Sequence, residues 1–95
     1  MEKIVKELKE KCKALFDKLP KDEDNCVVFD DENTLYLKDV FFGRGYIREI
    51  NGVSFEEDGS VWFWENNRED FFNLTTYDES EYEVFSKLLV ILSSM

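Results

Sequence analysis

Apolar residues recur at helical spacing over residues 2–19, and polar residues fill the positions between them. The apolar stripe consists of Ile4, Val5, Leu8, Cys12, Leu15, Phe16 and Leu19. The opposite face carries interleaved lysines and glutamates, as a solvated surface does when the other side of the helix faces a core. Pro20 ends the pattern, because proline cannot continue a helix and restricts the residue before it. This pattern predicts one amphipathic helix.

A second helical pattern runs from about Tyr77 to Leu92. Its stripe consists of Phe85, Leu88, Leu89 and Leu92. Thr76 and Glu79 have the spacing of a capping box, with the threonine at the N-cap and the glutamate at N3. The final turn, Leu88–Leu92, is apolar throughout, so it must be buried either in the core or against a second subunit.

Between the two helices the pattern changes to short runs of β-forming residues separated by polar turns. The predicted strands are Cys26–Phe29, Thr34–Phe42, Tyr46–Ile50, the two arms of a hairpin within Val53–Glu65, and Asp70–Leu74. Short connections make neighbouring strands antiparallel. We therefore predict an α+β fold, with an N-terminal helix, an antiparallel meander of five or six short strands and a C-terminal helix, in a single domain over residues 1–95.

The hairpin within Val53–Glu65 is the best-defined part of this pattern. A two-residue loop at Asp58-Gly59 would mix polar and apolar residues on each face. A three-residue loop over residues 57–59 separates them cleanly and gives Gly59 the left-handed position that glycine favours, so we predict this register. One face then holds Val53, Phe55, Val61 and Phe63, and the other holds Ser54, Glu56, Ser60, Trp62 and Trp64.

The dipeptide Asn51-Gly52 is the strongest signal in the chain for a two-residue hairpin turn. Such a turn places Ile50 opposite Val53 and Arg48 opposite Phe55. It also adds Ile47 and Glu49 to the face of the two tryptophans. Arg48 then falls on the apolar side, where its stem can lie along the edge of the core.

The charges divide unevenly along the chain. There are 12 basic and 22 acidic residues, for a net charge of −10. Residues 1–21 hold seven lysines and four acids, a net charge of +3, and the remainder carries −13. An acidic body repels phosphate backbones and anionic lipids, so we expect neither a nucleic acid nor a membrane as partner. A protein with a basic surface is the electrostatically favoured partner.

The residues needed for common catalytic and metal chemistry are scarce. The chain has no histidine, and its two cysteines, Cys12 and Cys26, are too few for a disulfide framework or a cysteine-only zinc site. The pattern leaves the redox state of the two thiols open. Acidic residues gather in predicted turns, but none of these runs has the spacing of an EF-hand loop. We therefore expect no catalytic residue, no metal and no cofactor.

The aromatic face of the hairpin is the candidate binding site. Trp62, Trp64, Glu56 and Glu49 are the residues that we predict to bind a partner, since aromatic anchors within a charged rim are typical of binding hot spots. This prediction depends on whether a helix covers Trp62 and Trp64. If one does, the tryptophans belong to the core.

Together these features favour a non-enzymatic binding protein that engages a basic surface of its partner. Small acidic inhibitors, immunity proteins and nucleic-acid decoys act through such charge complementarity. The alternative is a structural module that forms a homodimer through Leu88–Leu92 or a free strand edge. With no signal peptide or membrane span in its pattern, the chain is expected to be cytoplasmic.

Overall fold

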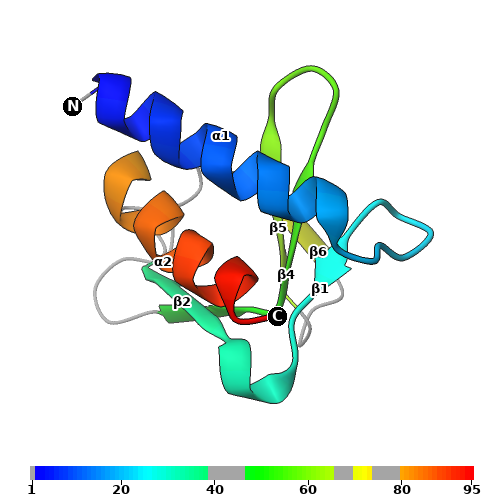
Figure 1. Ribbon diagram of the computed structural model, residues 1–95. Coiled ribbons are helices and arrows are strands. Elements are labelled where there is room, and N and C mark those ends of the chain that lie inside the picture. The colour runs from blue at the N-terminus through cyan, green and yellow to red at the C-terminus, as the bar shows by residue number, and fades with distance from the viewer. Residues whose placement is uncertain (1, 39–46, 66–69, 74–79) are drawn as a thin grey trace.

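Two helices flank the strands in sequence and pack on the same side of them (Figure 1). The computed structural model describes residues 2–38, 47–65, 70–73 and 80–95. Helix α1 spans Glu2–Lys18 and helix α2 spans Glu81–Ser93. The apolar stripe of α1 faces the core, where Cys12 and Phe16 are buried. The first helix therefore has the position and orientation that its sequence pattern predicts.

Helix α2 begins later than predicted. Ser80 is its N-cap: the Ser80 Oγ accepts a hydrogen bond from the backbone N–H of Glu83 at 3.3 Å and lies 3.2 Å from the Glu83 carboxylate. The backbone of Ser80 is extended, with ψ at 154°, so the helix cannot include it. Ser80 and Glu83 thus take the N-cap and N3 positions of the helix, and their side chains hydrogen-bond to each other. The predicted box at residues 76–79 lies outside the described residues.

The strands form two antiparallel sheets. The four-stranded sheet has the order β1 (Val27–Val28), β4 (Gly52–Phe55), β5 (Val61–Glu65) and β6 (Asp70–Asn73). The two-stranded sheet consists of β2 (Leu35–Lys38) and β3 (Ile47–Ile50), and a short 3-10 turn, η1 (Asp31–Asn33), precedes it. The predicted α+β class is confirmed, although the strands divide into two sheets instead of forming one meander. Residues 39–42, 46 and 74, the ends of three predicted strands, lie outside the described residues.

The predicted register of the β4–β5 hairpin is confirmed. Val53 pairs with Phe63, Ser54 with Trp62, and Phe55 with Val61. The backbone N–H of Glu56 donates to the Ser60 carbonyl at 2.9 Å, which closes the three-residue loop, and Gly59 has a φ of 90°. A left-handed residue at this position suits glycine, because it has no Cβ to clash.

The predicted hairpin turn at Asn51-Gly52 is wrong. Strand β3 pairs with β2, so that Ile50 lies opposite Leu35 and Arg48 opposite Leu37. Gly52 is already the first residue of β4. The Asn51 N–H donates to the Trp64 carbonyl at 2.9 Å, and the Asn51 carbonyl accepts from the Phe29 N–H at 2.6 Å. The chain passes straight from one sheet to the other at Asn51, because β3 already finds its hydrogen-bond partners in β2.

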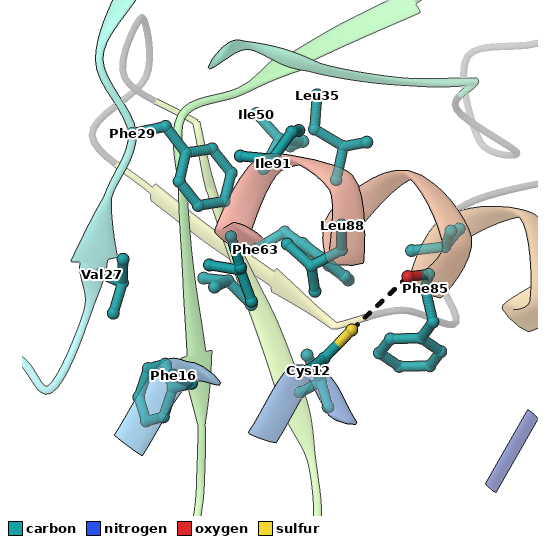
Figure 2. Packing of buried hydrophobic residues seen from close by; sticks show 14 of the residues in the cluster. Cys12, Phe16, Val27, Phe29, Leu35, Ile50, Phe63, Phe85, Leu88 and Ile91 are labelled. Carbon is teal, nitrogen blue, oxygen red and sulfur yellow. Dashed lines mark hydrogen bonds between the residues drawn. The ribbon is translucent and has the colours of Figure 1, made fainter. Parts of the chain in front are cut away.

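One hydrophobic core draws on both helices and both sheets (Figure 2). Phe63 of β5 lies between Cys12 and Phe16 of α1 on one side and Leu88 of α2 on the other. Leu88 and Leu92 are 0% and 1% exposed, so these two side chains are buried in this core and are not available to a second subunit, whereas Val90 in the same stretch is 70% exposed.

A buried ion pair joins the two sheets. The Arg48 Nη1 of β3 donates to the Glu65 Oε2 of β5 at 3.1 Å, and the two side chains are 2% and 5% exposed. Both residues occupy inward positions of their strands. On β3 the buried positions are Arg48 and Ile50, and on β5 they are Val61, Phe63 and Glu65. Arg48 was predicted to lie opposite Phe55 with its stem along the edge of the core. That prediction is wrong, because Arg48 lies opposite Leu37 and is fully buried beside Glu65.

We expect removal of one member of this pair to cost about 3–5 kcal/mol of the free energy of unfolding, because the other charge stays buried and loses this contact. Arg48→Met and Glu65→Leu are the single changes, and the double variant should lose clearly less than the sum of the two single losses, because each single change already removes the contact between the two side chains. Denaturant titrations followed by circular dichroism measure the three values.

The exposed ion pair between Lys13 and Asp17 on α1 supplies the control. Asp17→Asn should change the unfolding free energy by less than about 1 kcal/mol, since solvent screens such pairs. Equal losses in all single variants, or a double variant as unstable as the sum of its singles, would contradict the role of the buried pair.

Candidate functional site

The two tryptophans lie on the face of the four-stranded sheet that points away from the helices. We call this the tryptophan face, and among its described side chains are Val28, Ser54, Trp62 and Trp64. The opposite face, which carries Val53 and Phe63, packs into the core with α1 and α2. Of the residues that the structure describes, neither tryptophan belongs to the core cluster, and both are half-buried. Neither described helix covers them.

Trp62 lines a hollow at the end of the β4–β5 hairpin, which we call the acidic hollow. It is an open depression of about 780 Å³. Its described lining includes Asp24, Glu56, Glu57, Asp58, Ser60 and Trp62. Four acidic residues thus line the hollow together with one tryptophan, and none of the described lining residues is basic.

Hydrogen bonds within the hairpin loop fix the indole and one carboxylate in place. The Trp62 Nε1–H donates to the Ser60 Oγ at 3.0 Å, and the Ser60 hydroxyl donates to the Asp58 Oδ1 at 2.6 Å. The backbone N–H of Ser60 also donates to Asp58, at 2.9 Å. The Ser60 hydroxyl and then its N–H hold the pKa of the Asp58 carboxyl below its usual range. Asp58 therefore stays ionised well below neutral pH.

A second serine positions Glu56. The Ser54 hydroxyl is buried and donates to the Glu56 Oε1 at 2.8 Å. Ser54 and Ser60 are the polar residues that the predicted register places beside Trp62, and in the structure both hold side chains of the acidic hollow. Positioned acceptors lose less conformational freedom when they bind a donor than mobile ones do.

Asp24 reaches the hollow from a distant part of the sequence. In the loop before β1, the Asp22 Oδ1 accepts the backbone N–H groups of Asp24 and Cys26 at 2.9 and 3.0 Å. Asn25 adopts a left-handed conformation with φ at 61°, and its side-chain amide donates to the Phe55 carbonyl at 3.4 Å. This loop is thereby attached to the hairpin. The sequence pattern marks it only as an acidic turn, so the contribution of Asp24 was not predicted.

The structure brings together two of the four predicted binding residues. Glu56 and Trp62 both line the acidic hollow. Trp64 shares the tryptophan face but is not among the described residues of the hollow. Glu49 lies opposite Tyr36 in the two-stranded sheet. Its predicted place beside the tryptophans depended on the Asn51-Gly52 turn, and that placement is wrong.

Gly52 allows the tryptophan face to pack tightly beside Trp64. A Cβ atom at this position would lie 2.8 Å from the Cys26 Sγ, 3.1 Å from the Val27 carbonyl oxygen and 3.4 Å from the Trp64 Cβ. The first two distances are too short for a side chain, so only glycine fits without a shift of its neighbours.

The two cysteines are free thiols, each in a different environment. Cys12 is in the core, where its Sγ–H donates to the Phe85 carbonyl at 3.5 Å (Figure 2). Cys26 lies against Gly52, next to the tryptophan face. Burial raises the pKa of each thiol from 9.0 to about 12, and for Cys26 the nearby Asp22 adds to the rise. Neither thiol has the low pKa of a nucleophilic cysteine.

Among the described residues, no group of three or more acidic or cysteine side chains is arranged to hold a metal ion. Neither α1 nor α2 has the length and apolar character needed to span a bilayer.

Comparison with protein-family models, with curated proteins and with solved structures found no match for this chain.

We expect both thiols to be protected in the native protein. At pH 8 a rise from 9.0 to about 12 in the pKa lowers the thiolate fraction about a thousandfold, and the thiolate is the reactive form. A chromogenic disulfide reagent should therefore react with both thiols in denaturant and very slowly without it. A native thiol that reacts as fast as a free cysteine peptide would contradict the burial described above.

Proposed function

We propose that this protein is a non-enzymatic binding domain that holds a basic side chain of a protein partner in the acidic hollow, against the indole of Trp62. The observation that carries the proposal is the arrangement of the hollow: one half-buried tryptophan lies among four carboxylates, two of which are held by serine hydroxyls. Of the four predicted residues, the proposed site keeps Trp62 and Glu56, and it adds Asp24, Glu57 and Asp58.

An arginine or lysine of the partner matches this arrangement chemically. A cation over a tryptophan face gains about 0.5–1 kcal/mol when exposed and about 2 kcal/mol when desolvated. Arginine adds a planar fork of donors that fits carboxylate oxygens and stacks on aromatic rings. The charge of −13 on residues 22–95 favours the approach of a basic surface before contact is made.

The carboxylates of the hollow suit binding better than catalysis. A carboxylic acid that donates a proton near neutral pH needs a raised pKa, which normally requires a deep, water-poor pocket. The pKa of Asp58 is lowered instead, and the hollow is open to solvent. We therefore assign no catalytic role to these residues, and the proposed domain acts by covering or sequestering a basic surface.

Two single-tryptophan variants test the proposal. Trp64→Phe leaves Trp62 as the reporter, and Trp62→Phe leaves Trp64. We expect an arginine-rich peptide to change the fluorescence of the Trp64→Phe variant and to leave that of the Trp62→Phe variant nearly unchanged, because only Trp62 lines the hollow. A glutamate-rich peptide of equal length should give no response in either variant. Salt at about 0.5 M should weaken the response, since it screens exposed charges.

A pair of charge variants supplies the matched control. In the Trp64→Phe background, Glu56→Gln removes one carboxylate from the hollow, and Glu7→Gln removes one from the exposed surface of α1. Both changes alter the net charge equally, but only Glu56 lines the hollow. We therefore expect the first change to weaken peptide binding several-fold more than the second. Equal effects of the two changes, or an equal response from both single-tryptophan variants, would refute the assignment of the hollow.

A further inference from the structure

A second depression, on the other side of the hairpin, has the opposite charge. We call it the lysine groove. It lies between α1 and the hairpin, and its described lining consists of Lys6, Lys9, Glu10 and Lys13 from the helix and Phe55, Glu56 and Gly59 from the hairpin. Phe55 packs on Phe16 of α1, with ring centroids 5.1 Å apart. The groove therefore combines an apolar floor with a rim of three lysines and two glutamates, a small excess of positive charge, and of the lysines Lys13 is also paired with Asp17.

The hairpin ends beside this groove in an exposed acidic tip, Glu57 and Asp58. Figure 1 shows that the hairpin loop projects beyond α1. Glu56 and Gly59, which adjoin the tip, form one wall of the groove. Because the hairpin is itself a wall, the tip cannot fill the groove of its own molecule.

We infer that two copies of this chain associate reciprocally, with the acidic tip of each hairpin in the lysine groove of the other copy. The tip and the groove have complementary charges and lie next to each other. A two-fold axis near the hairpin therefore forms both contacts at once, and such an interface closes at the dimer. This inference rests on the groove and the tip alone and does not depend on the proposed partner.

The net charge limits the strength of this dimer. Two bodies of −10 repel each other at long range, although at physiological salt the repulsion is screened beyond about 8 Å. Contacts between the tip and the groove act at shorter range. We therefore expect an association that is visible only at high protein concentration.

Sedimentation equilibrium of charge-reversal variants tests the inference. The wild type should change from monomer to dimer as its concentration rises. Lys6→Glu/Lys9→Glu reverses the groove, and Glu57→Lys/Asp58→Lys reverses the tip; each should remain monomeric alone. An equimolar mixture of the two should form a heterodimer, because an acidic tip then meets a basic groove at one contact and a basic tip meets an acidic groove at the other.

Two comparisons separate this interface from a general effect of charge. Lys11→Glu/Lys18→Glu changes the net charge by the same amount as the groove variant, at exposed positions outside the described lining, and should still dimerise. The tip variant reverses two negative charges, which moves the net charge from −10 to −6. If net charge alone governed association, this variant would dimerise more strongly than the wild type, whereas we expect the dimer to be lost.

A wild type that stays monomeric at the highest attainable concentration would overturn the inference. So would groove and tip variants that still dimerise, which would place the interface elsewhere, such as at a strand edge. Circular dichroism checks that each variant is folded. The response of Trp62 to an arginine-rich peptide is a separate readout, so this inference and the proposed function can fail independently.

Discussion

The relative position of the two sheets depends on the buried contact between Arg48 and Glu65. The sheets share no paired strand within the described residues; the chain links them at Asn51, and this ion pair links them through side chains. Two charges removed from water are stabilised only when their geometry is good. Other arrangements of the sheets that separate the two charges are therefore strongly disfavoured. The pair thus favours the observed arrangement, in which the shared core also joins the two sheets beneath α1 and α2.

The β4–β5 hairpin serves two purposes because successive side chains of a strand point to opposite faces. Its inward residues, such as Phe63, complete the core with the helices. Its outward residues, such as Trp62, meet the solvent side and are held by short-range hydrogen bonds within the hairpin. The core thus fixes the strands, and hydrogen bonds to Ser54 and Ser60 position Glu56, Asp58 and Trp62 within the acidic hollow. The tip lies between this hollow and the lysine groove and borders both.

The sequence pattern predicts those features that depend on local segregation of apolar and polar residues. The hairpin register follows from the alternation around Trp62, since a slip of one residue would expose the core face. The Asn51 junction could not be found in this way, because tertiary pairing overrode a strong local turn signal. The placement of Glu49 depended on that turn and failed with it. Asp24 joins the hollow through a loop that is far from the hairpin in sequence, so the local pattern does not indicate its position. The alternation of β5, by contrast, does indicate that Glu65 points inward.

The junction at Asn51 and Gly52 also affects the chemical stability of the protein toward deamidation. Asparagine followed by glycine is the sequence that most readily loses ammonia, when the glycine nitrogen attacks the asparagine side chain and forms a cyclic imide. Here the Asn51 amide donates to the Thr34 Oγ1 at 3.1 Å, and Gly52 is held in a strand between β1 and β5. The side-chain hydrogen bond of Asn51 and the pairing of β4 with both of its neighbours restrain the two groups that would have to react. Chemical damage at this site is thereby coupled to unfolding, so the lifetime of the intact chain is governed by the time that it spends folded.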